Sequence, residues 1–139
     1  MSASDRQLVR AEAKAALVAS AYLAGFTEIS AWAQSVDVAA LPAWAVATPR
    51  EMRDRVAQTR DQRELTLAIV IKRVGAEDIE DQMDADADAI EAALMPALIN
   101  DNRDCDLTQT ETRVDGDGAQ RVGTLTMAFT ITYWVDDLV

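Results

Sequence analysis

Two stretches of strict alternation between apolar and other side chains constrain the fold of this chain most. From 124 to 135, every second residue is a large apolar one, and this set is Leu125, Met127, Phe129, Ile131, Tyr133 and Val135. The same period of two runs from 65 to 72, through Leu65, Leu67, Ile69 and Ile71. Because successive side chains of a strand point to opposite faces of a sheet, both stretches are predicted to be strands with one buried face.

Each of these strands has a candidate hairpin partner. The threonine-rich segment 107–114 is predicted to pair with 124–135 through a turn whose glycines can take positive φ, made of Asp115, Gly116, Asp117 and Gly118. The polar segment 51–58 is predicted to pair with 64–73 and to lie at a charge-protected edge of the sheet. The loop of that hairpin is predicted at 59–63. A further strand, 43–48, is predicted to begin after Pro42 and to stop at Pro49.

Two segments have the 3.6-residue apolar period of an amphipathic helix. The first is 5–24, with a capping box at Ser4 and Gln7, an end at Gly25, and a predicted buried stripe of Leu8, Ala11, Ala15, Val18 and Tyr22. The second is 78–95, which Pro96 is expected to end or kink, with a buried stripe of Ile79, Met83, Ala87, Ile90 and Leu94. Its outer face is predicted to be acidic, formed by Glu77, Asp78, Glu80, Asp81, Asp84, Asp86, Asp88 and Glu91.

These elements predict an α+β fold, in which two helices pack on a mainly antiparallel sheet of about four to five strands. The length of 139 residues suits one domain, and no repeat or linker divides the chain, so we expect residues 1–139 to form a single domain. Between 26 and 40 the pattern leaves a short strand and an irregular loop both open, with Phe26, Ile29 and Trp32 as the residues concerned.

The composition excludes the most familiar catalytic chemistries. The chain has no histidine and a single cysteine, Cys105, so it can form neither a Ser-His-Asp nor a Cys-His arrangement nor an intrachain disulfide. We therefore predict no catalytic residues, no cofactor and no enzymatic activity. The N-terminal residues lack the apolar core of a signal peptide and of a membrane span, which predicts a protein made in the cytoplasm and not inserted in a membrane.

The acidic residues suggest a metal site only at first sight. Asp84, Asp86 and Asp88 resemble the start of a calcium loop, but the glycine and glutamate that such a loop needs are replaced by Ala89 and Met95. Asp115 and Asp117 could hold a cation, yet Asp-Gly pairs are what a tight turn requires for its backbone. We expect no dedicated metal site and leave open weak Mg²⁺ or Ca²⁺ binding by the acidic helix face.

The formal net charge of −11 argues against broad binding of DNA phosphates. Seven basic residues lie between 50 and 73, but four carboxylates are interleaved with them, so a solvated sheet face is favoured over a nucleic-acid contact. Trp134 lies on the face of its strand opposite the core residues. It is either covered by another element of the chain or offered to a partner as an interface anchor, and the sequence leaves both open.

The order and spacing of these segments resemble phage minor tail protein U, the tail-terminator family. The resemblance is carried by Leu41-Pro42-Ala43-Trp44-Ala45-Val46, by Glu64-Leu65-Thr66-Leu67-Ala68-Ile69-Val70, by the helix 78–96, and by the final hairpin from Asp115-Gly116 through Leu125-Thr126 to Ile131-Thr132-Tyr133. It spans most of the chain from about Arg10 onward, and residues 26–40 match poorly.

The resemblance implies a structural virion protein. Six copies would close into a ring that caps the tail tube, ends tube polymerisation and provides the surface for head attachment. The implied partners are other copies of the chain, the tail tube protein and a head-tail connector protein. The implied location is the virion tail, after assembly in the bacterial cytoplasm. A ring of six such chains would carry a charge of about −66, so DNA is expected to pass through it without specific binding.

Two hairpin loops and one side chain are the candidate contact sites. We expect the loops to face partners, and their residues are Arg60, Asp61, Gln62 and Arg63 in one loop and Asp115, Gly116, Asp117 and Gly118 in the other. Trp134 is the candidate interface anchor. Three alternatives stay open at this point: another head-tail connector or neck subunit, a small divalent-ion-dependent α+β enzyme or ligand-binding domain, and a regulatory adaptor that binds one host protein.

Overall fold

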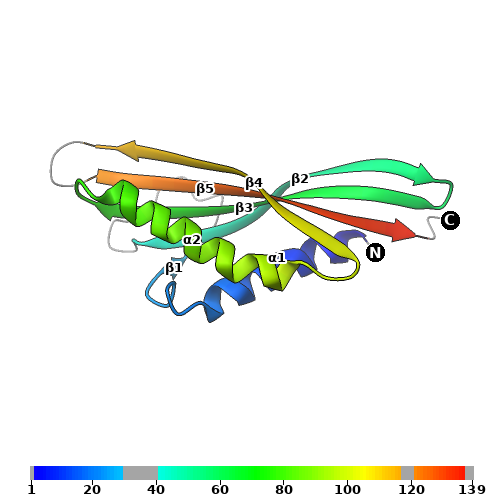
Figure 1. Ribbon diagram of the computed structural model, residues 1–139, viewed down its shortest axis with the longest axis horizontal. Coiled ribbons are helices and arrows are strands. Elements are labelled where there is room, and N and C mark those ends of the chain that lie inside the picture. Colours follow the sequence, from blue (N-terminus) through cyan, green and yellow to red (C-terminus); the bar gives the residue numbers. More distant parts are fainter. Residues whose placement is uncertain (1, 30–40, 117–120, 137–139) are drawn as a thin grey trace.

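The computed structural model describes residues 2–29, 41–116 and 121–136 (Figure 1). Its elements, in chain order, are α1 (Ser2–Ala19), β1 (Thr27–Glu28), β2 (Ala43–Ala57), β3 (Arg60–Gly75), α2 (Ile79–Leu98), β4 (Arg103–Asp115) and β5 (Arg121–Asp136). The five strands form one sheet in the order β1-β2-β3-β5-β4. Only the short β1–β2 pair is parallel, and the other three pairs are antiparallel. The predicted α+β fold with a mainly antiparallel sheet is confirmed.

The hydrophobic core lies between the two helices and one face of the sheet. The alternating sets of β3 and β5 face it, with Phe129 fully buried among the largest core side chains, and α2 adds Met83, Ile90 and Leu94. Each large side chain buried in this way stabilises the fold by about 1.5–3 kcal/mol. Gly123 lets α2 approach β5 closely, because a Cβ at this position would lie 2.7 Å from the Sδ of Met83.

The buried face of α1 differs from the predicted one. Leu8, Val18 and Tyr22 are 54%, 66% and 46% exposed, and the core side chains from this helix are Val9, Ala13 and Leu17. The prediction of the stripe was therefore wrong. An alanine-rich helix has two apolar stripes of similar width, so hydrophobic periodicity alone does not decide its rotation.

Two arginines fix the rotation of α1 against β2. Arg6 donates a hydrogen bond of 2.7 Å to the carbonyl oxygen of Thr48, and Arg10 donates one of 2.7 Å to its hydroxyl oxygen. The predicted bounds of this helix were also wrong. It begins at Ser2, before the predicted cap at Ser4, and it ends at Ala19. Gly25 lies further along the chain, in a turn closed by the hydrogen bond from the N–H of Phe26 to the carbonyl oxygen of Leu23, and does not have positive φ.

Neither proline ends the element that it was expected to end. β2 continues through Pro49 to Ala57, because a register shift between Ala47 and Arg50 takes Pro49 out of the regular ladder. α2 continues through Pro96 to Leu98. Leu98 is fully buried, and its packing holds the last turn of the helix even though Pro96 has no backbone N–H to donate.

The sheet is longer than the layer of helices. In Figure 1 the β2–β3 hairpin and the end of β5 extend past the N-terminal end of α1 at the right of the view. We call this end of the sheet, residues 50–64 and 130–136, the distal sheet. Neither helix, within the residues that the structure describes, has a segment long and apolar enough to cross a membrane.

Candidate interaction site

The distal sheet contains one of the two predicted loops, but it places the residues differently. Arg60, Asp61, Gln62 and Arg63 belong to β3, where they pair with residues 136 to 133 of β5, and the turn of the hairpin is formed by Gln58 and Thr59. Asp61 and Arg63 are only 8% and 3% exposed. The prediction of an exposed loop at 59–63 was therefore wrong.

A buried charge cluster explains this difference. The inward-facing positions of β3 continue from Leu65 to Arg63 and Asp61, so two charged side chains occupy the core face. A nitrogen of Arg63 lies 3.7 Å from a carboxylate oxygen of Glu51, and another lies 3.8 Å from one of Asp61. Inward-pointing charges of this kind protect the end of a sheet against random pairing.

Tyr133 and Arg6 complete the charge cluster. The hydroxyl of Tyr133 donates a hydrogen bond of 2.9 Å to Glu51, whose carboxylate also lies 3.7 Å from the Nε of Arg6. Burial raises the pKa of Tyr133 to about 12, with a further contribution from the hydrogen bond to Glu51. The cluster therefore anchors the start of α1 to the distal sheet.

We expect Arg63 and Arg60 to respond differently to the same substitution. Arg63→Gln should lower the free energy of unfolding by about 1–3 kcal/mol, because it leaves the buried Glu51 carboxylate without one of its cations. Arg60→Gln changes an exposed side chain and should cost less than about 0.5 kcal/mol. Urea unfolding followed by circular dichroism measures both values. Equal values would show that Arg63 is not part of a buried charge cluster.

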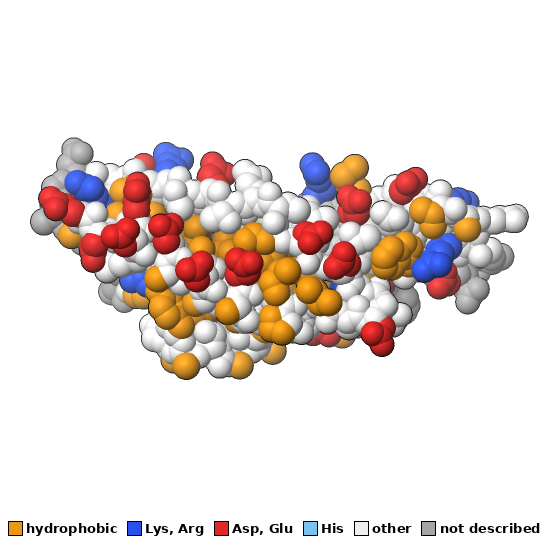
Figure 2. All heavy atoms as spheres, viewed as in Figure 1, with side chains coloured by type: hydrophobic (Ala, Val, Ile, Leu, Met, Phe, Trp, Pro, Cys, Tyr) orange, Lys and Arg blue, Asp and Glu red, His pale blue; other side chains and the backbone are white. Residues whose placement is uncertain are grey.

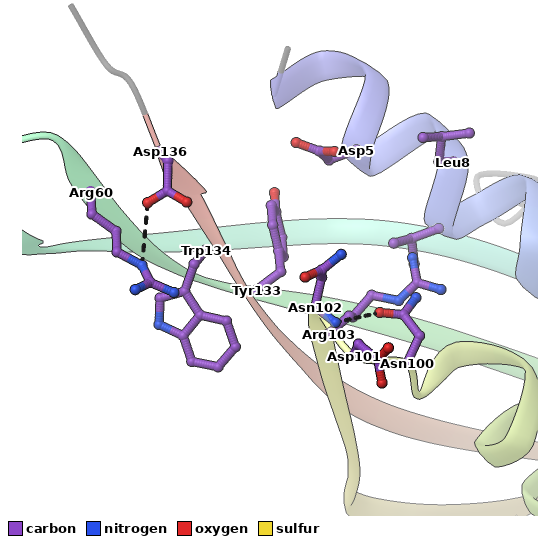
Figure 3. Close-up of a pocket in the computed structure, with 11 residues that line it drawn as sticks. Asp5, Leu8, Arg60, Asn100, Asp101, Asn102, Arg103, Tyr133, Trp134 and Asp136 are labelled. Carbon is purple, nitrogen blue, oxygen red and sulfur yellow. Dashed lines mark hydrogen bonds and ion pairs between the residues drawn. The ribbon is translucent and has the colours of Figure 1, made fainter.

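A polar pocket lies beside the distal sheet (Figure 3). It has a volume of about 550 Å³. One wall comes from the ends of β3 and β5, another from the turn between α2 and β4, and a third from the first turns of α1. Its lining includes Asp5, Arg60, Asn100, Asp101, Asn102, Arg103, Trp134 and Asp136.

The pocket brings together two residues that the sequence singled out. The guanidinium group of Arg60 lies over the Trp134 ring, 5.6 Å from its centroid, and the Nε of Arg60 lies 3.4 Å from a carboxylate oxygen of Asp136. Trp134 is 39% exposed. The sequence left open whether Trp134 is covered by the chain or offered to a partner. In the structure Arg60 covers the ring only in part, through a cation–π contact, and a large part of the side chain stays accessible.

The turn between α2 and β4 contributes residues that we did not predict. Arg103 donates a hydrogen bond of 2.7 Å to the carbonyl oxygen of Leu98 and pairs with Glu12 of α1. Asn100 accepts a hydrogen bond of 2.8 Å from the backbone N–H of Asn102. The pair with Glu12 holds the turn beside the middle of α1. A cluster of Asn and Asp between a helix and a strand signals a turn, but no sequence pattern indicated which side chains it would meet.

The second predicted loop is described only in part. Asp115 is the last residue of β4, and Gly116 has a φ of 99°, as a turn after this strand requires. Asp117 and Gly118 lie outside the described residues. The pairing of 107–114 with 124–135 is confirmed by the register of β4 and β5. That this turn contacts a partner stays a prediction.

One residue of the predicted acidic face is in the core. Asp86 is fully buried, and its two carboxylate oxygens accept hydrogen bonds of 2.9 and 2.8 Å from Arg73. The hydroxyl of Tyr22 donates a third one, of 2.7 Å. Arg73 also lies over the ring of Phe26, 5.2 Å from its centroid. We call these four residues the Asp86 cluster, and it ties the segment after α1 to α2 and β3.

The Asp86 cluster also changes the assessment of the Asp84, Asp86 and Asp88 triplet. Asp84 and Asp88 are exposed, whereas Asp86 points inward and is fully hydrogen-bonded. Across residues 2–29, 41–116 and 121–136, no three carboxylate or thiol side chains lie together in a way that could hold a metal ion. Weak divalent-ion binding by the exposed carboxylates of α2 stays a prediction.

Cys105 is buried and not oxidised to a disulfide. Burial raises the pKa of its thiol to about 11, and Asp106 and Asp104 add to this shift. A thiol with such a pKa stays protonated near neutral pH and is a poor nucleophile.

The sequence was also compared with known proteins. Neither the protein-family models nor the curated proteins with which it was compared match this chain.

Proposed function

We propose that this protein is a structural subunit that assembles into a closed ring through the two edges of its sheet. The single observation that carries this proposal is the arrangement of these edges. Beyond Trp44, the outer side of β2 has no neighbouring strand among the described residues, and the outer side of β4 has none over its whole length. A sheet with two long open edges is prone to pair with further strands.

The directions of the strands suit addition of one copy to the next. The pairs β2–β3, β3–β5 and β5–β4 are all antiparallel, so β2 and β4 run in opposite directions. A rotation about an axis along the strands preserves strand direction. The β2 edge of a second copy would therefore lie antiparallel to β4, and repeated head-to-tail contacts of this kind close into a ring when the rotation closes.

The charges on the two edges are complementary. The open part of β2, residues 45–57, carries three arginines and two carboxylates, all between 50 and 57, a net charge of +1. β4 carries two arginines and four carboxylates, a net charge of −2. Pairing β2 with β4 brings opposite net charges together, whereas pairing β4 with β4 brings like charges together. Electrostatic complementarity thus favours the head-to-tail contact that a ring needs.

The resemblance to the tail-terminator family supplies the biological role in this proposal. A ring of this kind would cap the tail tube of a long-tailed phage, end its polymerisation and receive a head-tail connector protein. Its place would be the virion tail, and it would carry out no catalysis. The acidic ring would let DNA pass without gripping it.

One pair of residues tests the edge contact directly. Asp106 of β4 and Arg50 of β2 lie at the two ends of a single row across the sheet, through Thr130 and Thr66. In a ring whose copies pair β4 with β2 without a register shift, these two side chains of neighbouring copies would meet. Asp106→Arg and Arg50→Asp should each weaken association by roughly tenfold or more, and the double variant should restore it.

The experiment measures the size of the assemblies by native mass spectrometry and electron microscopy at high protein concentration, with and without Mg²⁺. Asp84→Arg is the matched control, because it makes the same change of charge on α2, away from both edges. Rings that form equally well in all variants would refute the edge contact. If the wild-type protein never associates, even in the presence of tail tubes, the proposed function is wrong.

A further inference from the structure

The sheet has a gap at the distal end of β5. Tyr133 is paired with Arg103, the first residue of β4, and β5 then continues through Trp134 and Val135 to Asp136. These last residues are paired with β3 on one side. On the other side, where β4 would lie if it were longer, no described residue pairs with them. Every second residue of this stretch therefore directs its backbone N–H and C=O toward an empty strand position.

The polar pocket occupies this gap. Trp134 and Asp136 line it from β5, and Asn100, Asp101 and Asn102 line it from the turn that precedes β4 (Figure 3). A volume of about 550 Å³ lies within the range of about 300–1,000 Å³ that is usual for ligand pockets. The site thus combines unpaired backbone groups with space beside them.

The free charges of the pocket are negative. Arg60 is paired with Asp136, and Arg103 is paired with Glu12. Asp5 and Asp101 have no ion-pair partner among the described residues, so the negative charges of their carboxylates are not neutralised there. An occupant with Lys or Arg side chains would neutralise them. The exposed ring of Trp134 offers an apolar surface for a side chain of the same occupant.

We propose that this gap is a binding site for a short extended segment of another protein, which adds to β5 as a single antiparallel strand and carries basic side chains. Main-chain hydrogen bonds to residues 134–136 would give affinity, and Asp5, Asp101 and Trp134 would give selectivity. The assignment does not depend on ring formation, because one copy of the chain supplies all of these groups.

A second copy of this chain fits the gap less well. Its open basic segment, residues 50–57, is already paired with β3 on one side, so it would bring a two-stranded hairpin. The gap offers the place of one strand, bounded by the turn at Asn100–Asn102. A single chain segment therefore matches the site better.

The test uses a positional-scanning library of acetylated and amidated hexapeptides, with binding measured by fluorescence anisotropy. We expect selection of Lys or Arg at alternate positions. The best peptide should lose at least about tenfold in affinity for the Trp134→Ala and Asp101→Asn variants. Asp84→Asn, an equal change of charge on α2, should leave the affinity unchanged. Circular dichroism of each variant checks that it is folded.

A second measurement separates strand addition from simple charge attraction. Methylation of the alternate backbone nitrogens of the peptide removes its main-chain donors and keeps its charge, so it should abolish binding. Amide exchange at residues 134–136 should slow in the complex, while exchange along β4 should not change.

Several outcomes would overturn the proposal. The library could select no sequence, or the methylated peptide could bind as tightly as the unmethylated one. Amide exchange could also slow along β4 and not at residues 134–136 of β5. A peptide with the sequence of residues 50–57 that binds as tightly as the best library peptide would assign the gap to a second copy and refute the assignment to another protein.

Discussion

Replacing Asp86 with alanine is expected to lower the free energy of unfolding by about 3–5 kcal/mol, more than any other single change of a charged residue discussed above. The carboxylate is fully buried and accepts two hydrogen bonds from Arg73 and one from Tyr22. Without it, the Arg73 guanidinium stays largely buried, since only 16% of its side chain is exposed, and it has lost its anion. Urea unfolding followed by circular dichroism gives the change in free energy.

Two control variants separate the charge from the packing. Tyr22→Phe removes one hydrogen bond whose donor, the Tyr22 hydroxyl, belongs to a partly exposed side chain, and it should cost only about 0.5–1.5 kcal/mol. The double variant Asp86→Leu with Arg73→Met replaces the ion pair by apolar side chains, and it should recover most of the stability lost in Asp86→Ala. A double variant as unstable as Asp86→Ala would contradict this account, because the loss would then come from the missing contacts of both side chains.

The burial of Asp86 could in part have been predicted from the sequence. It lies between Met83 and Ile90 on the buried stripe of α2, three residues after the first and four before the second. An acidic residue on an apolar stripe indicates a buried partner. Seven other carboxylates in the same segment concealed this signal. The partner itself could not be predicted, because Arg73 meets Asp86 only after β3 and α2 have packed together.

The strands were predicted best where one face is wholly apolar. In β3 and β5 the alternation fixes both the type of element and the face that is buried. The same rule extends back along β3 to Arg63 and Asp61, and applying it there would have placed both side chains inward. Their charge led instead to the prediction of a loop. Arg63 has one buried partner on its own strand, Asp61, and one on β2, Glu51, and the contact with Glu51 depends on the register of the hairpin.

The candidate site follows from tertiary structure more than from any motif. Arg60 and Trp134 were singled out separately, and they meet because β3 and β5 are neighbours in the sheet. The gap beside Trp134 exists because β5 extends past the first residue of β4. The relative lengths of two strands are set by where the preceding helix ends. Pro96 suggested an earlier end for that helix than the one at Leu98.

The second large effect is expected at high pH. The chain has no histidine, and the thiol of Cys105 and the hydroxyl of Tyr133 have pKa values raised to about 11 and about 12, from 9.0 and 10.0. For both groups the folded state holds its proton more tightly than the unfolded state does. The stabilisation is complete below pH 9 and is lost as the pH rises through the two folded-state values. Each group contributes about 2–3 kcal/mol.

The midpoint of urea unfolding, measured between pH 8 and pH 11.5 in the presence of a reductant, should therefore fall steadily from about pH 9 upward. Cys105→Ala should remove the part of the decrease that begins near pH 9, and Tyr133→Phe the part that begins near pH 10. The phenylalanine variant is also expected to lose about 1 kcal/mol at neutral pH, because Glu51 loses a hydrogen-bond donor. A midpoint that stays constant up to pH 11 would show that neither group is shielded from water as the structure requires.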